Sequence, residues 1–383
     1  MDKFNQDLFR IKKWAICICV IIAGCKGDAK QIVVGNVEVE VSMWSEHPAS
    51  ENPKHKSIVF VSGDEEYRSE EALPQLAKIL SKRHGFDCTV LYAQDPDQLG
   101  IVDPNYSSNI PGLEKLRNAD LMILFTRFRS LPAEQMKYID DYLLSGKPII
   151  GIRTSTHAFN FKDRDHPYAH YGYNYNGPKK EWKSGFGKYI LGETWYTHHG
   201  HHKYQSTRGI IPEESNNHPI LNGIENGDLW GPSDVYGVRE PIGDKAEILV
   251  LGQSIEGASK YDESDRNYGM NEADNVVAID SKHKQDDPKF NPNQLMPPIV
   301  WTKSYQLENG KKGTSMTSTI GASTDMLDVE VRRLFINGVY FLLDLKVPEK
   351  ANVDLIGDYN PTAFAFHDNK YWAKQRLVIS ELE

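Results

Sequence analysis

Short apolar runs that alternate with amphipathic helical segments are the feature that most constrains the fold of this chain. The runs lie at residues 57–62, 88–92, 121–125 and 148–152. Each is shorter than an ordinary helix and mostly apolar, as expected of a strand that is buried on both faces. Segments with helical periodicity at residues 69–85 and 132–146 separate them. The pattern therefore predicts an α/β fold with a largely parallel sheet and helices on both faces.

The later part of the chain follows a different pattern. Runs at residues 247–252, 298–301 and 315–321 have strand character, but no long helix lies between them. We expect them to extend the sheet in antiparallel fashion, because antiparallel neighbours do not need a helical crossover. A helical stripe at residues 328–345 is the last strong element of the domain.

The N-terminus has the features of a bacterial lipoprotein signal. Basic residues precede the apolar run 14–23, which is too short to span a bilayer and suits the core of a signal peptide. The run ends in small residues followed by Cys25, which resembles a lipobox in which the cysteine carries lipid. An ordinary signal peptide or a short anchor is the alternative.

We accordingly divide the chain into four parts. They are a signal peptide at residues 1–24, a tether with a candidate edge strand at 25–55, the main domain at 56–346 and a C-terminal extension at 347–383. A lipid anchor implies the cell envelope, on the periplasmic or surface side, with the membrane as a partner. The formal net charge of −9, without a compensating basic run, disfavours nucleic acid as a partner. No pattern indicates the oligomeric state.

Polar residues follow three of the predicted strands at the point where each strand ends. Asp64 follows the first run, Arg127 follows the third, and Arg153 and His157 follow the fourth. Ligands of open α/β sheets bind beyond the carboxyl ends of the strands, so we expect these side chains to line one crevice. The alternative is that each loop is simply polar. Covalent catalysis is not indicated, because Arg153 stands where a nucleophile would be needed and arginine cannot attack.

The stretch LGETWYTHHGHHK at residues 191–203 has four histidines among its last six residues. Gly200 and the preceding aromatic residues disfavour a helix. In an extended chain His199 and His201 share one face, where they can chelate zinc or a similar divalent ion with His157 or Asp234 as a third ligand. The other two histidines would then face away. A metal-free acid/base cluster and a solvated loop are the alternatives.

The order and spacing of seven motifs resemble the ThuA (trehalose-utilisation) domain family. The motifs are GIRTSTHAF at 151–159, LGETWYTHHGHHK at 191–203, NHPILNGI at 217–224, DVYG at 234–237, PPIVWTKSY at 297–305, TSTIGAS at 317–323 and NGVYFLLD at 337–344. The resemblance implies that residues 56–346 form a ThuA-like domain. Its fold would be the three-layer, flavodoxin-like fold of the class I glutamine amidotransferases, without their cysteine, so amidotransferase activity is not expected.

The chain departs from the family pattern at two positions. Many members have histidine directly after the strand where this chain has Arg153, and a Gly-His pair near the last strand where this chain reads Gly-Ala-Ser at residues 321–323. A role carried over to these positions is therefore not supported by the resemblance.

The resemblance also implies a function in carbohydrate metabolism, including oxidised (keto) glycosides. We expect a hydrolase or isomerase in which His157 is the acid or base, Arg153 polarises a substrate oxygen, and Asp234 is a second base or a ligand. The expected substrate-binding residues are Asp64, Arg127, Trp195, Arg208 and Tyr236. The alternative is a non-catalytic lipoprotein that binds carbohydrate.

The lipid anchor can be tested by substitution. Cys25→Ser should move the protein from the membrane fraction to the soluble fraction, because the acyl chains rather than the folded domain would hold it at the membrane. Ultracentrifugation of cell lysates measures the partition, with Cys88→Ser as the matched control. Unchanged partition of Cys25→Ser would contradict lipidation at this cysteine.

Overall fold

The computed structural model describes residues 29–383 except 35–36, 51, 241, 244–245 and 282–289. It divides into two units, Met1–Ser42 and Met43–Glu383. The predicted signal peptide and Cys25 lie outside the described residues. In the first unit, strands β1 (Ala29–Val34) and β2 (Val37–Ser42) pair as an antiparallel hairpin.

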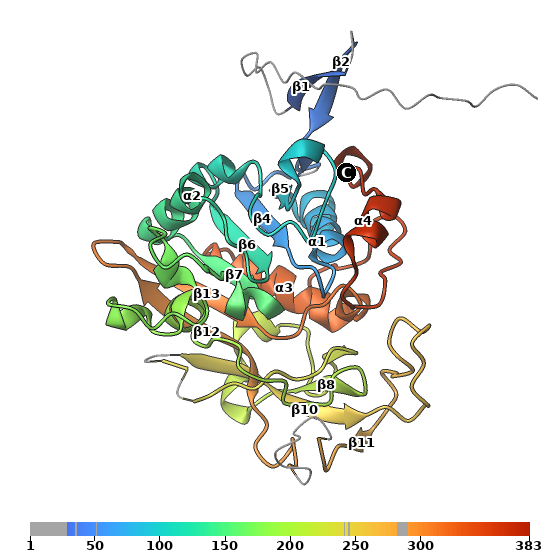
Figure 1. Cartoon of the computed structure of the whole chain (residues 1–383). Coiled ribbons are helices and arrows are strands. Elements are labelled where there is room, and N and C mark those ends of the chain that lie inside the picture. Colours follow the sequence, from blue (N-terminus) through green and yellow to red (C-terminus); the bar gives the residue numbers. More distant parts are fainter. Residues whose placement is uncertain (1–28, 35–36, 51, 241, 244–245, 282–289) are drawn as a thin grey trace, which may run out of the picture. The chain divides into compact units, whose positions relative to one another are not determined.

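The second unit is built on one eleven-stranded mixed sheet (Figure 1). Its strands are β3 (Trp44–His47), β4 (Ser57–Gly63), β5 (Asp87–Tyr92), β6 (Leu121–Thr126), β7 (Ile149–Ile152), β8 (Gln205–Ile210), β9 (Trp230–Gly231), β10 (Glu247–Glu256), β11 (Val276–Val277), β12 (Pro298–Gln306) and β13 (Lys312–Ser318). The order across the sheet is β3-β5-β4-β6-β7-β13-β12-β10-β8-β9, with β11 paired to β10.

The sheet has a parallel half and an antiparallel half, as the sequence predicts. Strands β5, β4, β6, β7 and β13 run parallel to one another. Beyond β13, the strands β12, β10, β8 and β9 pair antiparallel, which confirms the expected change of pattern late in the chain. The edge strand beside β5 is β3, which pairs antiparallel with it. All of β3 lies within residues 25–55, the segment predicted to be a tether with an edge strand.

Helices cover both faces of the parallel half, which confirms the three-layer α/β fold. The main helices are α1 (Ser69–His84), α2 (Ala133–Leu144) and α3 (Val329–Leu342), and the short α4 (Asn369–Gln375) lies in the C-terminal extension. Alternate residues of the buried strands divide between two cores, because successive side chains of a strand point to opposite faces. Ile58 and Phe60 pack in the core of α1 and α3, whereas Val59 and Val61 pack in the core of α2.

Two helix boundaries are explained by the residues at the helix ends. Gly85 ends α1 with a φ of 74°, a left-handed conformation that glycine adopts without steric cost. Asp328 begins α3, because its carboxylate accepts a hydrogen bond from the Val331 amide. Among the residues described, no helix is long and apolar enough to cross a bilayer.

Burial makes the centre of the sheet sensitive to loss of volume. Ile150 on β7 is 0% exposed, so Ile150→Ala should lower the free energy of unfolding by about 2–5 kcal/mol. Ile279 is 76% exposed, and Ile279→Ala is therefore the matched control that should change little. Urea denaturation of both variants measures the difference. Similar losses in the two variants would show that Ile150 does not lie in the core.

Candidate active site

Three loops at the carboxyl ends of parallel strands come together, as expected. The loop after β6 hydrogen-bonds to its neighbours on both sides: the Arg127 amide donates to Gly63 at the end of β4, and the Phe128 amide donates to His157 beyond β7. The Arg127 guanidinium also pairs with Glu65, at 2.5 Å. Polar side chains from β4, β6 and β7 therefore share one end of the sheet.

Asp234 is the centre of the candidate site. Its carboxylate is 0% exposed and accepts hydrogen bonds from the Nδ1 atoms of His198, at 2.7 Å, and His202, at 2.8 Å. Arg153 donates to the same carboxylate at 3.1 Å. The Nε2 atom of His202 lies 3.6 Å from Glu66. We call these five residues the Asp234 cluster.

Backbone pairing explains why these two histidines meet one carboxylate. His198 forms an isolated bridge with Tyr236, and the amides of His199 and Gly200 both donate to the carbonyl of Val235. The chain then turns, with the amides of two following residues donating back to the carbonyl of His201. The segment is therefore extended only up to His198, and the turn returns His202 to the side where Asp234 lies.

The structure places His199 and His201, the predicted pair, outside the Asp234 cluster. His199 Nε2 lies 2.6 Å from the carbonyl oxygen of Pro292, and its ring packs against Phe290. The His201 ring stacks on Tyr204, at 4.2 Å between centroids. Alternation of side chains holds only in an extended strand, and the turn after Gly200 ends it.

The imidazoles of the cluster have pKa values that differ in direction. Burial lowers the pKa of His198, but the charge and hydrogen bond of Asp234 outweigh burial, so the pKa is raised above its ordinary value. Burial dominates at His202 and lowers its pKa. Burial also raises the pKa of the Glu66 carboxyl to about 7. Opposite shifts in neighbouring groups separate a proton donor from a proton acceptor.

The predicted catalytic residue Arg153 is buried within the cluster. Its side chain is 0% exposed and lies between the rings of Tyr67 and Tyr236, at 4.0 and 4.2 Å from their centroids. Besides the carboxylate, it donates to the backbone carbonyls of Asp234 and Thr319. The guanidinium therefore neutralises Asp234 from within the protein, where no substrate can touch it.

His157 lies in an aromatic wall beside the cluster. Its ring centroid is 4.8 Å from Phe128, 5.3 Å from Trp195 and 6.3 Å from Tyr236. Burial, together with the nearby positive charges of Arg127, His198 and Arg153, holds its pKa well below the ordinary value. Its surroundings therefore favour the neutral imidazole, and the predicted Trp195 and Tyr236 are its immediate neighbours.

Two of the predicted substrate-binding residues have structural contacts instead. Asp64 is fully buried, and its carboxylate accepts hydrogen bonds from the amides of Glu66 and Tyr67 and from the Thr154 hydroxyl. Arg208 donates to the backbone carbonyls of residues 227, 272 and 274. Asp64 therefore shapes the loop that carries Glu66, and Arg208 fixes neighbouring loops.

Sequence reasoning missed Glu66 and the C-terminal extension as parts of the site. Glu66 follows Asp64 and Glu65 in the loop directly after β4, so its place beyond the strand is a usable signal. Phe364 contacts the ring of His202 at 5.4 Å, and Phe366, which is 57% exposed, lies beneath Arg127 at 4.7 Å. Nothing in the local sequence pattern indicates these two contacts, because they join residues far apart in the chain.

Comparisons with known proteins show only distant similarity. No protein-family model matches the chain, and no curated protein sequence matches it. A solved structure described as a ThuA-like protein from Bacteroides uniformis is 15% identical, with a TM-score of 0.42, and covers 76% of this chain and 93% of its own. One from Parabacteroides merdae is 13% identical, with a TM-score of 0.40, and covers 84% and 99%. A cytoplasmic protein from Salmonella typhimurium is 13% identical, with a TM-score of 0.35, and covers 74% and 98%.

The shifted imidazoles give a measurable titration pattern. His198 should titrate above, and His202 and His157 below, the ordinary histidine value of 6.5 in NMR spectra of the wild-type protein. The pair of His198 with Asp234 then adds stability that is complete below pH 6.5 and is lost as the pH rises through the folded pKa of His198. Asp234→Asn should lower the pKa of His198, whereas Asp354→Asn, at an exposed carboxylate, should not. An unchanged His198 titration in Asp234→Asn would contradict the pairing.

Proposed function

We propose that the chain is an enzyme that transforms a sugar or keto-glycoside by proton transfer at the Asp234 cluster. One observation carries the proposal: a single buried carboxylate holds two imidazoles whose pKa values are shifted in opposite directions. The His198 and His202 side chains are 29% and 17% exposed, so the cluster reaches solvent through its imidazoles. Asp234 orients both rings through their Nδ1 atoms and stabilises the charged form of His198.

The geometry supports a division of roles between the two histidines. His198, as the protonated ring, would donate a proton to the carbonyl oxygen of a keto-sugar. His202, as the neutral ring, would remove a proton from the carbon next to that carbonyl. Glu66 would then accept a hydrogen bond from the imidazolium that His202 becomes. These two proton transfers give an enediol. Isomerisation and loss of a glycosidic substituent both proceed from an enediol, so the proposal covers both outcomes.

The carbohydrate substrate is supported by the side chains around the cluster. Trp195 and Phe366 provide aromatic surfaces of the kind that pack on pyranose rings, and Phe366 is exposed, whereas Tyr236 is buried behind Trp195. Arg127, held between Glu65 and Glu66, has a partly exposed guanidinium that can donate to sugar hydroxyls. These contacts suit a neutral, hydroxylated ligand with a flat apolar face.

A divalent metal is the second candidate, because ligand atoms of His198, His202 and Asp234 lie within 4.8 Å of one another. These residues replace the predicted pair His199 and His201 as the candidate ligands. A bound zinc would polarise a substrate oxygen in place of a protonated imidazole. The fit is weaker than for the metal-free cluster, because Arg153 already places a permanent positive charge 3.1 Å from the same carboxylate.

We also propose that the protein is lipid-anchored at the bacterial cell envelope. The proposal rests on the basic residues, apolar run and small residues that precede Cys25. A non-catalytic carbohydrate-binding lipoprotein remains the rival function. It would need the same aromatic surfaces but not the opposed pKa values of the two histidines.

Substitution of the imidazoles tests the enzymatic proposal. His198→Gln and His202→Gln should each lower kcat on 3-keto-glycosides by about 10²–10⁴-fold, because each removes one proton-transfer group. His55→Gln, at an exposed histidine, is the matched control and should leave kcat unchanged. The melting temperatures of the three variants, compared with that of the wild-type protein, check that each variant is folded.

The same assay separates the three candidates. Wild-type protein that binds glycosides but leaves 3-keto-glycosides and free keto-sugars unchanged, with and without added divalent ions, would overturn the enzymatic proposal. Activity that is lost on chelation and restored by zinc, in protein purified without a histidine tag, would establish the metal-assisted candidate. The metal-free proposal expects full activity after chelation.

A further inference from the structure

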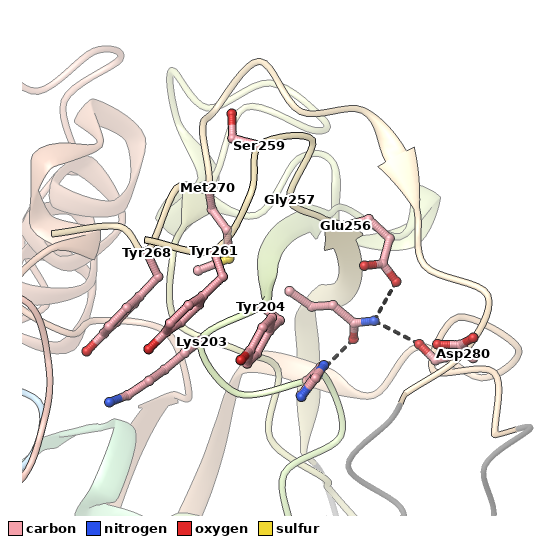
Figure 2. Close-up of a pocket in the computed structure, with 11 residues that line it drawn as sticks. Lys203, Tyr204, Glu256, Gly257, Ser259, Tyr261, Tyr268, Met270 and Asp280 are labelled. Carbon is pink, nitrogen blue, oxygen red and sulfur yellow. Dashed lines mark hydrogen bonds between the residues drawn. The ribbon is translucent and has the colours of Figure 1, made fainter. Parts of the chain in front are cut away.

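We propose that a pocket lined by Tyr204, Tyr261 and Tyr268 binds a second sugar ring of the substrate, next to the ring that reacts at the Asp234 cluster. The pocket has a volume of about 280 Å³ (Figure 2). That is close to the lower end of ligand pockets, about 300 Å³, and suits one small ring. The inference rests on the proposed function for the class of substrate, but the pocket itself is defined by its own residues.

The three tyrosines form a rigid row. The rings of Tyr204 and Tyr261 are stacked at 4.7 Å between centroids with an angle of 18°, and those of Tyr261 and Tyr268 at 5.8 Å with an angle of 6°. His201 stacks on the outer face of Tyr204. Figure 2 shows the three rings as parallel plates with their hydroxyl groups on the same side. The Tyr268 hydroxyl donates to the Phe364 carbonyl, so the hydroxyls offered to a ligand are those of Tyr204 and Tyr261. Because the rings support one another, a ligand would meet them at little cost in side-chain entropy.

The polar side of the pocket is also held in place. The Gln205 side-chain amide donates to the Glu256 carboxylate at 2.7 Å and to the carbonyl of Asp280 at 2.8 Å, and its oxygen accepts from the His201 amide at 2.8 Å. Glu256 is thereby positioned at the pocket, where its carboxylate can accept hydrogen bonds from sugar hydroxyls.

The charge of the lining favours a neutral ligand over an anion. The pocket is lined by two carboxylates, Glu256 and Asp280, and by one ammonium group, that of Lys203. The ammonium lies 4.8 Å from the centroid of the Tyr268 ring and makes a cation–π contact with it, so it is less available to an anionic ligand. A neutral saccharide can use phenol and carboxylate groups together, whereas a uronate or phosphate would meet repulsion from the two carboxylates.

The pocket is joined to the Asp234 cluster by one turn of the chain and one phenylalanine. Within the turn, His202 points to Asp234, whereas Lys203 and Tyr204 line the pocket. The Phe364 ring lies 5.4 Å from His202 and 5.1 Å from Tyr268, and the Phe364 carbonyl accepts a hydrogen bond from the Tyr268 hydroxyl. The pocket and the Asp234 cluster therefore share one turn and one buried ring, and we place the two linked rings of the substrate on either side of them.

Removal of two hydroxyl groups tests the pocket without disturbing the row of rings. The double variant Tyr204→Phe/Tyr261→Phe should weaken binding of trehalose, maltose, cellobiose or lactose roughly tenfold, as expected for the loss of about two neutral hydrogen bonds. Isothermal titration calorimetry measures binding in the His198→Gln background, so that turnover cannot interfere. Tyr138→Phe, on α2, is the matched control and should bind as the parent does.

Glu256→Gln provides a second variant that keeps the shape of the pocket. It should weaken binding of the neutral disaccharides and relieve the exclusion of cellobiuronic acid, the anionic counterpart of cellobiose. Binding of none of the four disaccharides, or equal binding by the parent and the double variant, would overturn the pocket proposal. Failure of the proposed function gives a different result. A protein that binds disaccharides at this pocket but never turns over keto-glycosides would support the pocket proposal and contradict the enzymatic one.

Discussion

The buried ion pair between Arg153 and Asp234 is the interaction on which the rest of the site depends. Neither side chain has exposed surface, and burial of two charges is costly unless each is paired and hydrogen-bonded. The two terminal nitrogens of Arg153 bond to Asp234 and to the carbonyl of Thr319, and Asp234 also accepts from two imidazoles. Removal of either partner would leave an uncompensated buried charge, at a cost of about 3–5 kcal/mol. Folding and assembly of the site are therefore coupled.

The fold was predictable from the sequence because its signals are local. Runs such as residues 121–125 are buried on both faces in the structure, and Gly85 and Asp328 mark helix ends through their own backbone and side-chain chemistry. The site was predictable only in part. The sequence indicates the loops beyond the strands and Asp234, but alternation of side chains favours His199 and His201, whereas the structure places His198 and His202 beside Asp234. The carbonyl of Val235, which ends the extended segment after His198, is a tertiary partner that no local pattern reveals.

Two arginines balance the carboxylates around the Asp234 cluster. Arg153 neutralises Asp234 from inside the protein, while Arg127 pairs with Glu65 and Glu66 nearer the surface. Asp234, Glu65 and Glu66 therefore each have an arginine as a cationic partner. The two imidazoles remain as groups that can change charge near neutral pH, and the same carboxylate holds both rings in place.

The C-terminal extension belongs to the functional unit, although the motifs that resemble a known family end near residue 345. Phe364 is fully buried in the same core as α1 and α3, and its ring contacts Tyr67, His202 and Tyr268. It therefore supports one wall of the Asp234 cluster and one wall of the tyrosine pocket at the same time. A shift of the Phe364 ring would displace residues of both the Asp234 cluster and the pocket, because packed cores transmit small displacements rather than absorb them. The extension thus contacts both the Asp234 cluster and the pocket in which we place the second sugar ring.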